Sequence, residues 1–313
     1  MKRKFFTIIA IIRQAVDRRL KTALYLIPVA FFSTTFIAPV YAAVNDILPG
    51  DYYPGKVGNS AISIYAYHRK QIGPYKQKNK QANGKIGSSI LAARLTHNYL
   101  IKNMLVTGVA VLPWFNSKVE PKFLSDTLGK ETTGFSDLRL GATAWLINDP
   151  LNANYLALGS MLIAPTGHYN SNQLLNNGEN RWKLVVSDGW QKDITRQWLV
   201  EFSPEIVWYG ENNEFAGNKQ LKQKPSYALT TYLRSRIKPR LHLFLGSQIN
   251  RGGETQINGI DQHNSANNTR LMAGFSWFLP NKQQIILRAA KDISIENGFR
   301  TEQEIVLRYQ KSF

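Results

Sequence analysis

The chain has 313 residues, with 39 Lys or Arg against 21 Asp or Glu, and its formal charge at pH 7 is +18. It contains no cysteine, which excludes a disulfide framework and thiolate chemistry. Such a basic balance suggests nucleic acid as the partner of a cytoplasmic protein. The export features described next instead favour anionic lipid headgroups, and we therefore expect no nucleic-acid partner.

The first 42 residues are typical of an export signal. Seven basic residues occur in the first 21 positions, an apolar run covers 23–37, and Val40-Tyr41-Ala42 fits a small-x-small cleavage site. We predict cleavage after Ala42, which removes those seven basic residues and Asp17 and leaves a charge of +12. The alternatives are a twin-arginine signal at Arg18-Arg19 and a retained membrane anchor, and prolines within the apolar run disfavour the anchor.

Residues 43–57 form the next segment, which contains two prolines and two glycines and is predicted to be irregular. One interpretation is a disordered periplasmic tail. The other is a small plug that folds inside the domain formed by residues 58–313. Leu48, Tyr52 and Tyr53 provide apolar surface, which favours the plug.

Alternation of apolar and polar residues predicts about twelve strands in the rest of the chain. Long polar connections alternate with short ones, which is typical of an all-β, transmembrane antiparallel up-and-down β-barrel and of neither a soluble sandwich nor a propeller. The predicted strands are 58–69, 88–101, 104–116, 135–147, 155–165, 180–192, 197–209, 226–237, 241–251, 269–279, 283–293 and 301–313. The long connections are 71–87, 117–134, 166–179, 210–225 and 252–268, with a shorter one at 294–300.

The last predicted strand ends on an aromatic residue, Phe313. Ile305, Leu307 and Tyr309 share its apolar face. This pattern resembles the closing strand of bacterial outer-membrane barrels, which the barrel-insertion machinery recognises. We therefore expect that machinery, outer-membrane lipid and lipopolysaccharide as partners, and the bacterial outer membrane as the location.

Charged residues within the strands are predicted to point into the barrel, because a charge on the lipid face at mid-bilayer costs roughly 2–4 kcal/mol. The predicted lumen-lining charges are Arg139, Lys183, Glu201, Glu205, Arg234, Arg236, Arg270, Arg288, Asp292, Glu302, Glu304 and Arg308. Aromatic residues near strand ends fit interfacial girdles, with ordinary packing as the alternative. They are Trp114, Trp182, Trp198, Trp208, Tyr209 and Tyr227.

Catalytic and metal-binding patterns are weak. His168 and Ser171 faintly resemble part of the outer-membrane phospholipase site, but a spacing of three in an extended chain aims them in opposite directions. The five histidines have no second ligand at metal spacing. We expect no enzyme, no metal and no cofactor, and a phospholipase-like hydrolase is a remote alternative.

Five lysines cluster in and beside the first long connection: Lys70, Lys76, Lys78, Lys80 and Lys85. The simplest interpretation is a solvated face. Contact with lipopolysaccharide phosphates is the alternative.

From Leu48 to Phe313 the chain resembles the outer-membrane proteins of the phenol-degradation meta pathway, a family of barrels associated with uptake of aromatic or other apolar compounds. The stretches that carry the resemblance are 48–52, 140–150, 165–169, 178–183, 209–212, 252–255 and 294–299. The resemblance implies passive diffusion or binding of small hydrophobic or aromatic solutes. A structural or adhesive barrel is the competing interpretation.

Several of these stretches fall where strands meet long connections, at the predicted outer rim. We hypothesise an external vestibule in which aromatic residues stack a solute and charges hold the connections. Its predicted residues are Glu179, Arg181, Trp182, Tyr209, Glu211, Glu254 and Glu296. The alternative is that Gly and Asn supply turn geometry while Glu and Arg pair to close the mouth.

Overall fold

The structure is a computed structural model that describes residues 46–122, 126 and 128–313. The predicted export signal lies outside the described residues. Among those residues, no helix is long and apolar enough to cross a membrane. The strands are β1 (Ser60–Lys76), β2 (Asn79–Ile101), β3 (Met104–Glu120), β4 (Glu131–Phe135), β5 (Arg139–Asp149), β6 (Asn154–Ile163), β7 (Lys183–Asp193), β8 (Trp198–Tyr209), β9 (Asn212–Phe215), β10 (Lys219–Gln223), β11 (Ser226–Lys238), β12 (Leu241–Gly252), β13 (Thr255–Ile257), β14 (Ile260–Asp261), β15 (Ala266–Leu279), β16 (Gln283–Ile295) and β17 (Gly298–Ser312).

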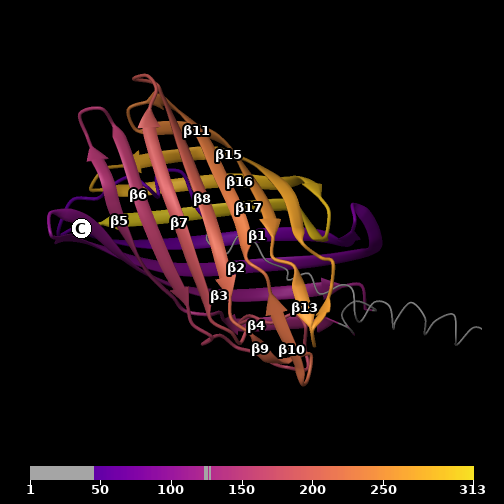
Figure 1. The fold of residues 1–313 in the computed structure, drawn as a ribbon. Helices are drawn as coiled ribbons and strands as arrows, with labels where there is room; N and C mark the ends of the chain where they lie inside the picture. The colour runs from indigo at the N-terminus through magenta and orange to yellow at the C-terminus, as the bar shows by residue number, and fades with distance from the viewer. Residues whose placement is uncertain (1–45, 123–125, 127) are drawn as a thin grey trace, which may run out of the picture. The chain divides into compact units, whose positions relative to one another are not determined.

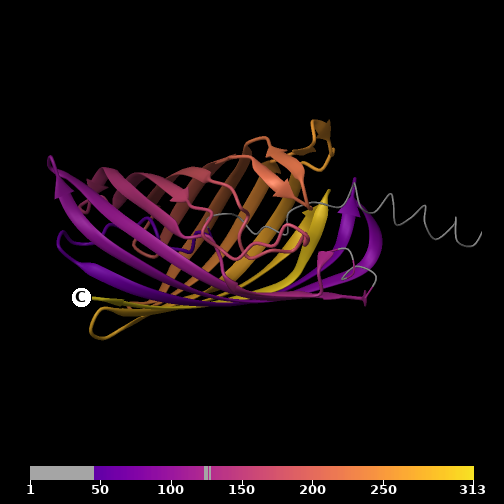
Figure 2. The ribbon, with the colours of Figure 1, turned by 90° about the horizontal axis from the view of Figure 1, so that it is seen from below.

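Twelve of these strands form one closed antiparallel barrel (Figure 1, Figure 2). The order of pairing runs from β2 through β1, β17, β16, β15, β12, β11, β8, β7, β6 and β5 to β3, and β3 pairs back with β2. β4 adds to the far end of β3. Closure pairs every edge strand, so that backbone N–H and C=O groups need no water. The predicted fold class and strand number are confirmed.

Short turns join the strands at the end of the barrel that holds the C-terminus. Lys102 and Asn103 both have positive φ, of 48° and 63°, and Asn281 and Lys282 have 58° and 57°. Two such residues in succession match the twist of the flanking strands, as in a type I′ hairpin. The short connections at 102–103 and 280–282 therefore agree with the prediction.

The structure corrects the prediction for the first long connection. β1 continues to Lys76 and β2 begins at Asn79, so that a two-residue turn replaces most of the predicted loop at 71–87. Polar residues and glycines occupy most positions of this extension, which hides the alternation that predicts a strand. The backbone nevertheless pairs without a break from Gln71 to Gly73 against Gly84 to Ile86.

Two further predicted loops contain strands. β9 and β10 lie within 210–225, β13 and β14 lie within 252–268, and together they form a separate four-stranded sheet. This sheet lies beyond the barrel wall at the end opposite the C-terminus (Figure 1). Its strands have two to five residues, which is too short for a periodic pattern to stand out.

The two faces of the barrel wall differ as the alternation predicts. Leu91 and Leu95 on β2 and Leu229 and Leu233 on β11 are exposed on the outer face. Their neighbours in sequence, such as Tyr232, are buried inside. A continuous outer belt of Leu, Ile and aromatic side chains is typical of a wall that faces lipid.

Candidate functional site: the occluded lumen

The segment before β1, residues 46–57, enters the barrel, and we call it the lumen segment. It makes a tight turn in which the Asp51 N–H donates to the Leu48 carbonyl over 3.1 Å. Gly50 has φ of +84°, a left-handed conformation that this turn requires and that glycine adopts readily. The turn presents side chains to the inner wall on several sides.

Apolar side chains of the lumen segment fill the centre of the barrel. Leu48 is fully buried in a cluster with Tyr65, Tyr232, Phe244 and Met272, among others. Ile47 and Tyr52 belong to a second cluster with Leu105, Trp145, Tyr155 and Ala157. The inward apolar side chains of the wall thus pack against apolar side chains of the lumen segment instead of lining a water-filled pore.

Gly189 on β7 makes the space for Tyr52. A Cβ atom at this glycine would lie 1.8 Å from the Tyr52 ring, far inside van der Waals contact. The Tyr52 hydroxyl then reaches Ser187 Oγ at 2.8 Å. The sequence carries this signal only as a glycine at an inward position of a strand.

Carboxylates of the lumen segment meet arginines of the wall. Both carboxylate oxygens of Asp46 accept hydrogen bonds from Arg288, at 2.6 and 3.0 Å. Asp51 pairs with Arg308 and lies 3.4 Å from Arg94. Bidentate arginine–carboxylate contacts fix both distance and orientation.

The wall also contains its own ion pairs. Glu304 is fully buried and contacts Arg69, Arg288 and Arg270, the last at 3.6 Å. Arg270 also donates to Asp292 at 2.9 Å. Eleven of the twelve predicted lumen-lining charges are buried or half-buried: Arg139, Lys183, Glu201, Glu205, Arg234, Arg236, Arg270, Arg288, Asp292, Glu304 and Arg308.

Glu302 is the exception, and its predicted inward orientation is wrong. Gln303 pairs opposite Lys70 and Thr301 opposite Gln71, so that the register skips Glu302 at a β-bulge. The extra residue shifts the alternation by one. Glu302 is therefore exposed, and Thr301 takes the inward place, where its hydroxyl accepts a hydrogen bond from Arg270 at 2.9 Å.

Three of the seven predicted vestibule residues, Glu179, Arg181 and Tyr209, form a cluster with Lys183 at the mouth of the barrel. We call these four residues the mouth cluster. Arg181 donates to Glu179 at 2.7 Å and lies 4.8 Å above the Tyr209 ring. Lys183 also pairs with Glu179. These side chains are buried or half-buried, and they contact one another at the adjoining ends of β7 and β8.

The remaining four predicted residues lie elsewhere. Trp182 is 53% exposed on the outer face, because it alternates with the inward Arg181 and Lys183. The prediction that its side chain lines a vestibule is therefore wrong. Glu211 pairs with Lys222 at 2.8 Å, and Glu254 with Lys224 at 2.6 Å. Glu296 accepts a hydrogen bond from Asn267 at 2.6 Å.

Asp137 links the connection before β5 to the connection between β6 and β7, which carries Glu179 of the mouth cluster. It lies between β4 and β5, where the sequence predicts a strand from 135, so the predicted start is also corrected. Its carboxylate accepts backbone hydrogen bonds from Gly167 and Glu179, each at 3.0 Å. Burial raises the pKa of Asp137 despite these donors.

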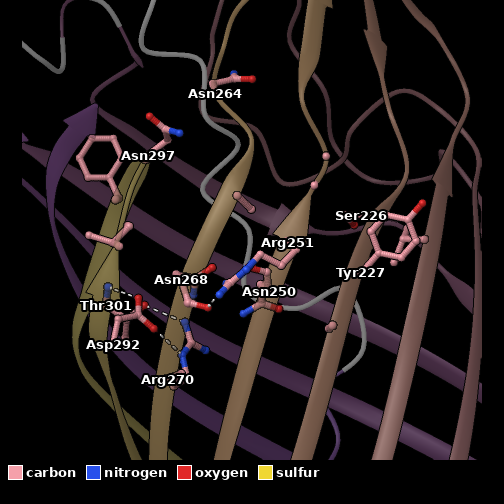
Figure 3. Close-up of a pocket in the computed structure, with 18 of the residues that line it drawn as sticks. Ser226, Tyr227, Asn250, Arg251, Asn264, Asn268, Arg270, Asp292, Asn297 and Thr301 are labelled. Atoms are coloured by element: carbon pink, nitrogen blue, oxygen red, sulfur yellow. Dashed lines mark hydrogen bonds and ion pairs between the residues drawn. The ribbon is translucent and has the colours of Figure 1, made fainter. Parts of the chain in front are cut away.

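A cavity of about 110 Å³ is formed by inner-wall and connection residues (Figure 3). Arg270, Asp292 and Thr301 line one side as a hydrogen-bonded group, and Asn250 and Asn268 project from neighbouring strands. Val207, Tyr227, Ile295 and Phe299 add apolar surface. Alternation does not single out these asparagines, because an uncharged amide facing lipid costs less than a charge and so indicates an inward position less strongly.

Comparisons with known proteins agree with this architecture. A family model described as "Putative MetA-pathway of phenol degradation" matches residues 69–308. An outer membrane channel from Pseudomonas putida F1 is similar in structure, with a TM-score of 0.80 and 28% identity over 86% of this chain and 100% of that channel. The beta domain of the Bordetella autotransporter BrkA shares the fold alone, with a TM-score of 0.50 and 13% identity over 82% of this chain and 100% of that domain. No curated protein matches the chain.

Proposed function

Because this chain belongs to the family of the phenol-degradation MetA pathway, we propose that it is an outer-membrane channel that passes small aromatic or other apolar solutes by passive diffusion. The similar protein of Pseudomonas putida F1 is an outer membrane channel, which supports the same location here. The lumen segment would act as the plug of this channel, since its side chains fill the centre of the barrel.

The cavity is the observation that carries the proposal. Its volume of about 110 Å³ is close to the roughly 150 Å³ of an engineered apolar cavity that binds benzene, so that it suits a solute with about one ring. Phe299 and Ile295 would contact the ring. Asn250, Asn268 and Arg270 would bind a polar substituent such as a hydroxyl group.

Filling the cavity should block the solute. Asn268→Trp on β15 places a large ring in the cavity and should lower uptake of a single-ring aromatic solute at least fivefold, while Leu271→Trp on the outer face of the same strand should leave uptake unchanged. Uptake is measured as growth of cells that depend on the solute at low concentration, with folded barrel quantified in their outer membranes. Equal uptake by both variants would refute the proposed path.

The competing adhesive function has less support. An adhesive barrel needs exposed apolar anchors on its outer connections. Of the large apolar side chains in the small sheet of β9, β10, β13 and β14, only Ile260 is exposed, and ion pairs such as Lys222 with Glu211 and Lys224 with Glu254 lie in and beside this sheet. Solute passage therefore remains the better explanation of the lumen.

The lysine-rich end of the β1–β2 hairpin supports contact with lipopolysaccharide phosphates. Lys70, Lys78, Lys80 and Lys85 are exposed there, and each lysine near an anionic surface contributes about 1 kcal/mol. Reversal of Lys78, Lys80 and Lys85 to Glu should reduce the lipopolysaccharide that copurifies with the barrel and its resistance to detergent. The control reverses Lys102, Lys238 and Lys282 on the opposite turns, and equal losses in both variants would contradict the contact.

A further inference from the structure

The lumen segment supplies carboxylates that offset part of the positive charge of a group of arginines on the described inner wall. Six inward arginines take part in ion pairs within the barrel: Arg69, Arg94, Arg234, Arg270, Arg288 and Arg308. The wall supplies three carboxylates to these pairs: Glu201, Asp292 and Glu304. The lumen segment supplies two more, Asp46 and Asp51. Without the segment, this part of the wall therefore has an excess of arginine.

Arg288 is positioned to receive a carboxylate from within the barrel. One side of its guanidinium group donates to Glu304 at 2.6 Å, which holds it against the wall. Its two terminal nitrogens bind the two oxygens of Asp46. Since Asp46 belongs to a segment outside the sheet, a free carboxylate of similar size could make the same bidentate contact.

Arg308 forms a second position of the same kind. Gln284 accepts a hydrogen bond from it at 2.7 Å, and Tyr65 lies beneath its guanidinium group at 5.9 Å. Arg94, fixed by a hydrogen bond of 3.3 Å to the Tyr65 hydroxyl, faces the same Asp51 carboxylate. Two arginines from β2 and β17 thus converge on one carboxylate that the wall itself does not provide.

We propose that Arg288 and the Arg94–Arg308 pair are binding sites for the carboxylate of a solute, which the lumen segment occupies with Asp46 and Asp51 in the closed channel. A solute anion exchanges with these side chains as it passes, and the open lumen selects anions. This inference rests on the proposed channel function and narrows its solutes to aromatic or apolar acids. Rings of arginine are the usual basis of anion selectivity in pores.

The first experiment measures ion selectivity of the full-length chain in planar bilayers. Asp46→Asn with Asp51→Asn removes both charges at nearly constant volume, and should raise the conductance severalfold and give a reversal potential that favours chloride over potassium by at least threefold. Asp149→Asn, in an exposed turn outside the lumen, should match the wild type. An open but cation-selective channel would overturn the proposal.

A second variant opens the lumen without altering any charge. Gly189→Leu removes the space that the Tyr52 ring occupies and should displace the lumen segment together with its carboxylates. Anion selectivity should again appear. If both variants open the channel without selecting anions, or if neither opens it, the lumen segment does not mask an anion site and the proposal fails.

The solute class is tested with benzoate and its neutral analogue benzyl alcohol. In the double Asp-to-Asn variant, benzoate should interrupt the ion current at concentrations at least tenfold below those that benzyl alcohol requires. Equal potency would reject the carboxylate sites and leave the proposed channel for aromatic solutes intact. If neither compound affects the current, the lumen does not take aromatic solutes, and both the carboxylate sites and the proposed solute class are contradicted.

Discussion

Glu304→Gln should destabilise the barrel by roughly 3–5 kcal/mol, the range expected when one partner of a buried ion pair is removed. Glu304 is fully buried and contacts Arg69, Arg270 and Arg288. The substitution preserves the volume but leaves three guanidinium groups short of one negative charge in a site that water cannot reach. Urea unfolding of the barrel in lipid vesicles, followed by tryptophan fluorescence, measures the loss.

Glu302→Gln is the matched control, two residues earlier on the same strand. Its side chain is exposed because of the β-bulge, and surface substitutions of this kind stay within about 0.5 kcal/mol. Simple alternation predicts similar losses for both variants. Equal destabilisation would therefore contradict both the bulge and the buried network around Glu304.

Glu179→Gln should open the mouth of the barrel. Burial alone would raise the pKa of Glu179, but Lys183 and Arg181 outweigh it and lower the pKa from 4.5 to about 2. A shift of this size corresponds to roughly 3 kcal/mol in favour of the closed arrangement of the connections. Without the charge, Arg181 and Lys183 should separate from position 179 and move toward water, and the current in planar bilayers should rise and fluctuate at pH 7.

Acid should produce the same opening in the wild type. Because the pKa of Glu179 is lower in the closed mouth than in an open one, its stabilisation is complete above about pH 4.5 and is lost as the pH falls toward 2. The wild-type current should therefore rise within this window, and the current of the Glu179→Gln variant, which is already raised at pH 7, should rise less. Glu211→Gln, which removes a carboxylate from an exposed ion pair with Lys222, should titrate like the wild type.

Much of the barrel follows from local patterns in the chain. Alternation places Leu229 and Leu233 against lipid and Arg234 inside, and it does so in most strands because one face must avoid charge and the other need not. Short turns such as Lys102-Asn103 are also predicted from the sequence, and both of these residues have positive φ in the structure, as in a two-residue hairpin turn. The family resemblance adds the location of the mouth through stretches such as 178–183.

Two of the errors arise because local patterns do not report pairing. A single skipped residue in the register against β1 turns Glu302 outward, although its alternation matches that of Glu304. The error at Trp182 is different, because alternation with the inward Arg181 and Lys183 directs this side chain outward. The small sheet of β9, β10, β13 and β14 forms from two connections about thirty residues apart, which no window along the chain compares.

The sequence by itself determines a closed antiparallel barrel with an apolar outside and a charged inside, because the bilayer imposes one requirement on every strand in turn. Only the tertiary structure decides which charges meet. Asp46 and Arg288 are separated by 242 residues, and Tyr52 depends on a missing side chain at Gly189 on β7. Such contacts rest on three-dimensional closure, since the wall must first surround the lumen segment before its carboxylates can reach the arginines that they neutralise.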